Sequence, residues 1–166
     1  GYPAEDEDEE QEHTGAMIAL VPSSDDAERL ASDDGEAAED LHCTLIYLGE
    51  DVRGQDPTEL IDYLHYVAGN YGPIDAKIFG SAVFNSSSPD HCVVYLVGGS
   101  PDITPLYADL KRFVTERYPA AAEQHDPFHP HITAAYGAGV GMAYEGPVLF
   151  DRIGLRFPGA DQDFPL

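Results

Sequence analysis

Apolar runs and apolar stripes along the chain predict a mixture of strands and helices. Short apolar runs bounded by proline, glycine or polar turns predict strands over 17–21, 41–48, 74–84, 92–97, 131–136 and 148–157. Apolar residues at helical spacing predict two longer helices, which begin near Asp56 and Thr104, and Ser24 is a candidate cap for a short helix over 25–31. Neighbouring strands look like hairpins, which favours antiparallel pairing, so the expected fold class is α+β.

The beginning of the chain differs from the rest in composition. It contains the run Glu5-Asp6-Glu7-Asp8-Glu9-Glu10, closely followed by Glu12. So many like charges in one short segment cannot bury a surface, and we expect residues 1–14 to form a disordered acidic tail or linker. Residues 15–166 are expected to form one domain, either as a monomer or as part of a longer chain.

Charge narrows the classes of partner. The chain has 31 acidic and 8 basic residues, and its formal net charge is −23. Binding to long nucleic acid depends on many Lys and Arg contacts to phosphates, so a small nucleotide is the expected partner and long nucleic acid is not. No apolar run approaches the ~20 residues of a membrane span. We therefore expect no membrane partner. Reduced, buried thiols at Cys43 and Cys92 would suit a cytoplasmic protein.

Two His-x-Thr motifs are the candidates for the chemistry. They are His42-Cys43-Thr44 and His131-Ile132-Thr133, and each falls on a predicted strand. Side chains two residues apart share one face of a strand, so each histidine should project together with its threonine. Imidazole suits general acid–base catalysis near neutral pH, and a threonine hydroxyl can donate to a phosphate oxygen. Two such pairs across a cleft would supply a base, an acid and two phosphate donors without a metal.

The surroundings of the two motifs are also alike. Tyr47 and Tyr136 each come three residues after the motif threonine, with a glycine shortly beyond. In a regular strand both tyrosines would lie on the face opposite the histidines, so we expect them to pack in the core. Neither motif has a Lys or Arg nearby, whereas Arg152 and Arg156 share a face of the last predicted strand and could reach the cleft. Of the two interpretations, we favour surface arginines.

A histidine-rich segment near the second motif raises the alternative of a metal site. Its candidate ligands are His125, Asp126, His129 and His131. The prolines between these residues impose an extended path, and no second ligand cluster is evident, so we expect no metal and no cofactor. His129 precedes Pro130 and is a candidate for a contact with ligand at the rim of the cleft.

These motifs resemble those of the two-histidine (2H) phosphoesterase superfamily, which includes 2′-5′ RNA ligase-like and cyclic phosphodiesterase-like proteins. The first motif is similar to that family's His-x-Thr-Leu-x-aromatic-Leu-Gly pattern, and the second is similar to its His-Pro-His-x-Thr form. The resemblance implies a bilobal α+β fold with two mostly antiparallel sheets around a central cleft and helices outside. By this resemblance His42 and His131 are catalytic, while Thr44 and Thr133 bind phosphate.

The activity that the resemblance implies is metal-independent cleavage of a small nucleotide with a 2′,3′-cyclic, 2′-5′ or cyclic-oligonucleotide linkage. Two other hypotheses stay open. The first is a non-catalytic nucleotide-binding domain or an accessory domain of a phage structural protein, since residues 17–48 also resemble 2H domains found beside capsid-maturation proteins in phages and prophages. This resemblance implies a location in a bacterial cell or a phage-infected host. The second is a metal-dependent hydrolase that uses the histidine-rich segment.

Overall fold

The computed structural model describes residues 14–84, 91–119, 121, 124, 128–136 and 144–166. Seven strands in this part of the chain form one sheet in the order β1-β2-β5-β4-β3-β6-β7. The strands are β1 (Ala16–Pro22), β2 (Cys43–Gly49), β3 (Ile74–Phe84), β4 (Cys92–Gly98), β5 (His131–Tyr136), β6 (Gly146–Arg156) and β7 (Gln162–Pro165). The helices are α2 (Ser24–Leu30), the short 3₁₀ helix η1 (Ala38–Asp40), α3 (Thr58–Asn70) and α4 (Ile103–Arg117).

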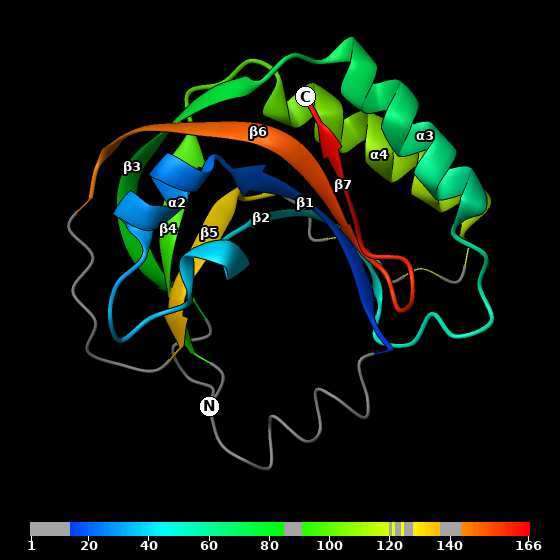
Figure 1. Ribbon diagram of the computed structural model, residues 1–166, viewed down its shortest axis with the longest axis horizontal. Helices are drawn as coiled ribbons and strands as arrows, with labels where there is room; N and C mark the ends of the chain where they lie inside the picture. Colours follow the sequence, from blue (N-terminus) through cyan, green and yellow to red (C-terminus); the bar gives the residue numbers. More distant parts are fainter. Residues whose placement is uncertain (1–13, 85–90, 120, 122–123, 125–127, 137–143) are drawn as a thin grey trace.

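The sheet bends into an arch around β6, which pairs along both of its edges (Figure 1). The first part of β6 pairs with β3, and its second part pairs with β1 on one side and β7 on the other. Strands β2 and β5 meet through a single pair of partners, Cys43 and Ile132. Every pairing is antiparallel, which confirms the α+β prediction, but the two expected sheets are joined into one.

Helices α3 and α4 lie side by side on the convex side of the arch (Figure 1). Leu60 and Leu64 of α3 and Leu106 and Leu110 of α4 are completely buried, in one hydrophobic core with Ile18 of β1. Burial of each such side chain contributes about 1.5–3 kcal/mol. Because the helices cover the convex side, the concave side of β1, β2 and β6 remains accessible for a site.

Local side-chain contacts set the beginnings of the helices. Oδ1 of Asp56 accepts a hydrogen bond from the backbone N–H of Thr58, the first residue of α3, at 3.0 Å. The capping position itself is Pro57, one residue later than the predicted cap Asp56. Helix α2 begins one residue earlier than predicted, and Ser23 is the cap in place of Ser24. Oγ of Ser23 accepts from the N–H of Asp26 at 3.3 Å.

Three further features bear on the predictions. The predicted acidic tail lies outside the described residues except for Thr14, whose Oγ1 donates to the carbonyl of Glu50 at 2.7 Å. Cys43 and Cys92 are both free thiols and both buried, as predicted. Among the described residues, no helix has the length and apolar character that a membrane crossing requires.

Candidate active site

The two motif histidines are held by the same backbone contact. Nδ1 of His42 lies 2.7 Å from the carbonyl oxygen of Asp40, and Nδ1 of His131 lies 2.7 Å from the carbonyl oxygen of His129. In each case the acceptor is the residue two positions before the histidine. His131 is the first residue of β5, whereas His42 immediately precedes β2, which begins two residues later than predicted.

This contact determines the protonation pattern of each imidazole. A carbonyl oxygen can only accept, so Nδ1 must carry the proton and donate it. In the neutral ring the second nitrogen, Nε2, then has a free lone pair and can act as a base. In the charged ring Nε2 carries a proton and can act as an acid. Both histidines are therefore arranged to exchange a proton through Nε2.

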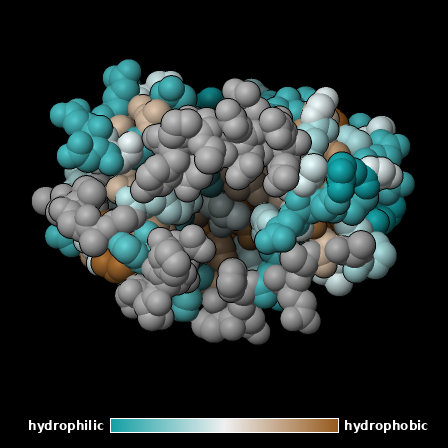
Figure 2. Space-filling view, turned by 90° about the horizontal axis from the view of Figure 1, so that it is seen from below, coloured by the Kyte–Doolittle hydropathy of each residue, from teal (hydrophilic) through white to brown (hydrophobic). Residues whose placement is uncertain are grey.

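A cavity of about 600 Å³ lies beside the first motif, on the concave side of the sheet. Viewed from this side, the molecule is hollowed near its centre (Figure 2). The cavity is lined by apolar positions of β1, by the loop before β2, and by residues of β5 and β6. Its lining residues are Met17, Ala19, Val21, Glu36, Glu39, Asp40, Leu41, His42, Thr133, Tyr136, Gly154, Arg156 and Asp161.

The cavity brings together His42 of the first motif, Thr133 of the second motif and Arg156 of β6. His131 is not among its lining residues, yet its charge lowers the pKa of His42, so the two imidazoles interact electrostatically. The ring of Phe84 packs edge-on against the ring of His131, with centroids 4.6 Å apart. Thr44 lies outside the lining, and its Oγ1 donates to the sulfur of Met17 at 3.6 Å.

The pKa of His42 is lowered from its ordinary value of 6.5. Burial is the main cause, because a buried ring loses the hydration that stabilises its charged form. The positive charges of Arg156 and His131 lower this pKa further, whereas the carbonyl and the carboxylate of Asp40 act in the opposite direction. At neutral pH, His42 is therefore mainly the neutral, proton-accepting ring.

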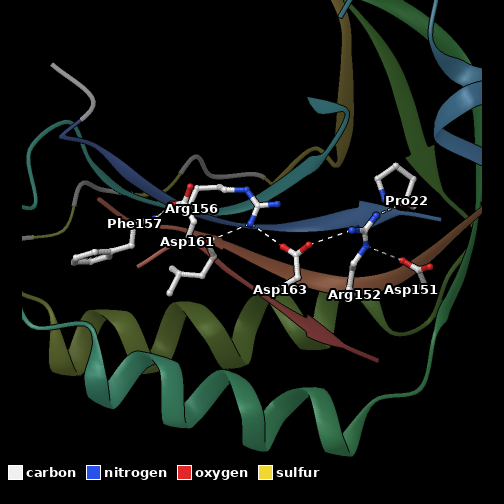
Figure 3. A network of polar contacts seen from close by, with 8 residues as sticks. Pro22, Asp151, Arg152, Arg156, Phe157, Asp161 and Asp163 are labelled. Atoms are coloured by element: carbon white, nitrogen blue, oxygen red, sulfur yellow. Dashed lines mark hydrogen bonds and ion pairs between the residues drawn. The ribbon is translucent and has the colours of Figure 1, made fainter. Parts of the chain in front are cut away.

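A carboxylate of β7 connects the two predicted arginines (Figure 3). Oδ1 of Asp163 accepts from Nη1 of Arg156 at 2.8 Å, and Oδ2 accepts from Nη1 of Arg152 at 3.1 Å. Arg152 also bonds to Asp151 and to the carbonyl of Pro22, and it lines a separate hollow of about 260 Å³. Arg156 thus lines the cavity, while Arg152 supports the network beside it.

Both motif strands contain a β-bulge one residue after the threonine. On β2, Thr44 and Ile46 oppose consecutive residues of β1, so Leu45 is the additional residue. On β5, Thr133 and Ala135 oppose consecutive residues of β4, in the same arrangement. A bulge of this kind reverses the alternation of side chains beyond it.

The bulges overturn the prediction that the motif tyrosines pack in the core. Tyr47 and Tyr136 turn to the face of the histidines, where they are 41% and 65% exposed, and Tyr136 lines the cavity. Tyr136 was not predicted as a site residue because a bulge depends on pairing with a distant strand. The side chain of His129 is exposed and does not line the cavity, so its contribution in this structure is the carbonyl that holds His131.

The alternative hypothesis of a metal site depends in part on residues that the structure does not describe. His125 and Asp126 lie outside the described residues. Within the described ranges, no group of three His, Cys, Asp or Glu side chains is arranged to hold a metal ion. Asp163, Glu36 and Glu39 are further residues at or beside the cavity that the sequence patterns did not indicate.

Solved structures with the same fold support this description. The chain matches TT0787 of Thermus thermophilus with a TM-score of 0.68 at 20% identity, over 92% of this chain and 95% of that one. It matches LigT of E. coli in its apo form with a TM-score of 0.56 at 19% identity, over 92% and 94% of the two chains. It also matches a protein described as a phosphoesterase, with a TM-score of 0.56 at 18% identity, over 92% and 95%.

No curated protein matches the sequence. The family model and the solved structures give no support to the predicted phage association. The family model of the 2′-5′ RNA ligase superfamily matches residues 19–153, a range that contains both His-x-Thr motifs and reaches six of the seven described strands. The chain therefore belongs to the 2′-5′ RNA ligase superfamily, a group of 2H phosphoesterases and ligase-like enzymes.

Proposed function

We propose that residues 15–166 form a metal-independent phosphodiesterase domain that acts on a small nucleotide through His42 and His131. The observation that carries this proposal is that both imidazoles make the same hydrogen bond to the backbone. Each Nδ1 donates to the carbonyl two residues earlier, at 2.7 Å in both cases, which leaves each Nε2 for proton transfer. Histidines with a purely structural role do not require the same orienting bond in two places. Acid–base catalysis does use two oriented imidazoles, one neutral as the base and one charged as the acid.

His42 is the proposed base. Its lowered pKa favours the neutral ring, whose Nε2 can take a proton from the attacking oxygen. For a 2′,3′-cyclic phosphodiester the attacking oxygen belongs to water. For a 2′-5′ linkage or a cyclic oligonucleotide it belongs to water or to a neighbouring ribose hydroxyl.

His131 is the proposed acid. Its charged ring would protonate the ribose oxygen as the bond from phosphorus to that oxygen breaks. Thr133 and Arg156, which share the cavity with His42, would donate hydrogen bonds to the remaining phosphate oxygens as negative charge develops there. Thr44 would do the same from β2 after its hydroxyl turns away from the sulfur of Met17, which is a weak acceptor.

A nucleotide is the proposed substrate class because of the chemistry of the site and its likeness to LigT. Crystal structures of E. coli LigT in complex with ATP and with NADP+ match this chain with TM-scores of 0.55 and 0.54. A cavity of about 600 Å³ is within the usual range for sites that bind small molecules. Tyr136 at its edge provides an aromatic surface on which a base can stack.

The test is hydrolysis of 2′,3′-cyclic nucleotides, 2′-5′-linked dinucleotides and cyclic dinucleotides in excess chelator, with His42→Asn and His131→Asn beside the wild type. We expect turnover of at least one of these classes by the wild type and its loss in both variants. His65→Asn is the matched control, because His65 lies on α3 and does not line the cavity. Full activity in either motif variant would contradict the proposal, and tight nucleotide binding without turnover would favour a non-catalytic binding domain instead.

A further inference from the structure

Very few positively charged residues are available to line the cavity. The chain has eight Lys and Arg residues, and none of them falls in the undescribed segments, so the position of every one is known. Only Arg156 is among the residues that line the cavity. Segments outside the described residues can therefore bring no further lysine or arginine to a ligand bound there.

The other seven cations lie outside the lining of the cavity. Arg53, Arg112 and Arg117 form exposed ion pairs with carboxylates at 2.6, 2.8 and 3.1 Å. Arg29 binds Asp26 and the carbonyl of Pro147 at the start of β6. The two lysines lie on β3 and α4, and Arg152 is shared between carboxylates in the network of Figure 3.

Negative charge, in contrast, surrounds the same cavity. Glu36, Glu39 and Asp40 line it from the loop and short helix before β2, and Asp161 lines it from the turn before β7. The loop is fixed against β5, since the N–H of Glu36 donates to the carbonyl of Ala134 at 2.8 Å. Arg156 itself is partly neutralised by Asp163 at 2.8 Å. One phosphate beside Arg156 and the motif residues would be stabilised, whereas a second phosphate would lie near carboxylates, and no second Lys or Arg is among the described residues that line the cavity.

We propose that the cavity selects its substrate by charge and takes a nucleotide with one phosphate, such as a nucleoside 2′,3′-cyclic monophosphate. This inference rests on the function proposed above and narrows it. Cyclic dinucleotides, 2′-5′ oligonucleotides of three or more nucleotides, and nucleotides with an additional 5′-phosphate carry a second charge that the carboxylates repel.

The same charge pattern favours release of the product. Water adds across the cyclic diester: its oxygen bonds to phosphorus, one ribose oxygen leaves, and that oxygen receives the proton. A diester with one negative charge thereby becomes a monoester with a charge of about −1.5 to −2 near pH 7. Repulsion by the surrounding carboxylates then weakens binding of the product relative to the substrate.

The test compares 2′,3′-cyclic AMP with the same nucleotide carrying a 5′-phosphate. At low salt we expect kcat/KM to be lower for the 5′-phosphorylated form by roughly tenfold or more, as several carboxylates act on the added group. Added salt should narrow the difference, because ions screen exposed charges. Glu39→Gln, alone and combined with Glu36→Gln, should narrow the difference by about two- to fivefold per residue, while Glu116→Gln on the outer face of α4 should leave it unchanged.

Equal kcat/KM for the two nucleotides at low salt would overturn the inference, as would a difference that the Gln variants leave intact. If the wild type hydrolyses neither nucleotide, calorimetric binding of the same two compounds tests the charge preference by itself. The proposed function fails only if the wild type does not hydrolyse 2′-5′-linked or cyclic dinucleotides either. Tighter binding of 2′,3′-cyclic AMP would support the preference. Equal binding, tighter binding of the 5′-phosphorylated form, or binding of neither would overturn it.

Discussion

Nη1 of Arg156 lies 2.8 Å from Oδ1 of Asp163, and this contact fixes the arginine that faces the cavity. The other oxygen of the same carboxylate holds Arg152 at 3.1 Å. Asp163 belongs to β7, a strand of four residues at the end of the chain, which pairs with β6 beside both arginines. The last strand of the fold thus positions a charge next to the first histidine motif.

Replacement of Arg156 should change both the strength and the pH dependence of catalysis. Arg156→Gln removes a charged donor from the proposed phosphate site, so kcat/KM should fall by roughly ten- to a hundredfold. It also removes one of the charges that lower the pKa of His42, so the acidic limb of the pH–rate profile should move to higher pH. Steady-state kinetics from mildly acidic to mildly basic pH measure both effects.

Arg112→Gln is the matched control for that experiment. Arg112 forms an ion pair with Asp109 at the same distance of 2.8 Å, but it lies on α4 and not at the cavity. Unchanged kinetics are expected for this control. An acidic limb that stays in place in Arg156→Gln would disprove the electrostatic connection between Arg156 and His42.

The free energy of unfolding should report the burial of His42. Its pKa is lowered in the folded protein, so below about pH 6.5 the unfolded chain binds a proton that the folded one binds less readily. This contribution to stability is complete above about pH 6.5 and declines as the pH falls toward the lowered pKa. Denaturant unfolding at about pH 7.5 and about pH 5.5 should therefore show a smaller advantage of wild type over His42→Asn at the lower pH. If the difference in stability between wild type and His42→Asn stays constant or grows at the lower pH, the lowered pKa of His42 is contradicted.

The two motif tyrosines should differ in their effect on substrate binding. Tyr136 lines the cavity, whereas Tyr47 is exposed on the same face of the sheet without lining it. If a base stacks on Tyr136, Tyr136→Ala should raise KM by roughly five- to a hundredfold. Tyr47→Ala is the control at the equivalent motif position and should leave KM near its wild-type value. Equal effects of the two substitutions would argue against a base beside Tyr136.

Gly35 should be required for the packing of the cavity loop. A Cβ at this position would clash with the carbonyl oxygen of Ala134, which is backbone and cannot move aside easily. Gly35→Ala should destabilise the protein by about 1–3 kcal/mol in denaturant unfolding. Gly69→Ala, at a site in α3 with no neighbour within 4 Å, should instead stabilise it by about 0.5–1 kcal/mol. A Gly35→Ala variant as stable as wild type would show that the loop is not held closely against β5.

Features that depend on local patterns could be predicted from the sequence. The strands around both motifs, the beginning of α3 just after Asp56 and the buried stripes of α3 and α4 follow from local periodicity and turn chemistry. Features that depend on distant strands were missed. The bulges at Leu45 and Ala134 arise from pairing with β1 and β4, and they turned the predicted faces of both tyrosines.

Two other features were beyond local patterns for different reasons. Strand β7 has the sequence Gln-Asp-Phe-Pro, in which only Phe164 is buried, so it has too few apolar residues to form a recognisable pattern. The hold on each imidazole comes from a backbone carbonyl, which every residue possesses, so no residue type at positions 40 or 129 could indicate it. Sequence patterns predict which side chains take part, but the bonds that orient them follow from the backbone path.

The most direct test of catalysis by the histidine pair compares kcat for 2′,3′-cyclic nucleotide hydrolysis in His42→Asn, His131→Asn and the double variant, all in excess chelator. If the two imidazoles act together as base and acid, each single substitution should lower kcat by about 10²–10⁴-fold. The double variant should then be only slightly slower than the slower single variant, because one partner contributes little without the other. Wild-type activity in either single variant, or activity that disappears with chelator in the wild type, would contradict catalysis by a histidine pair.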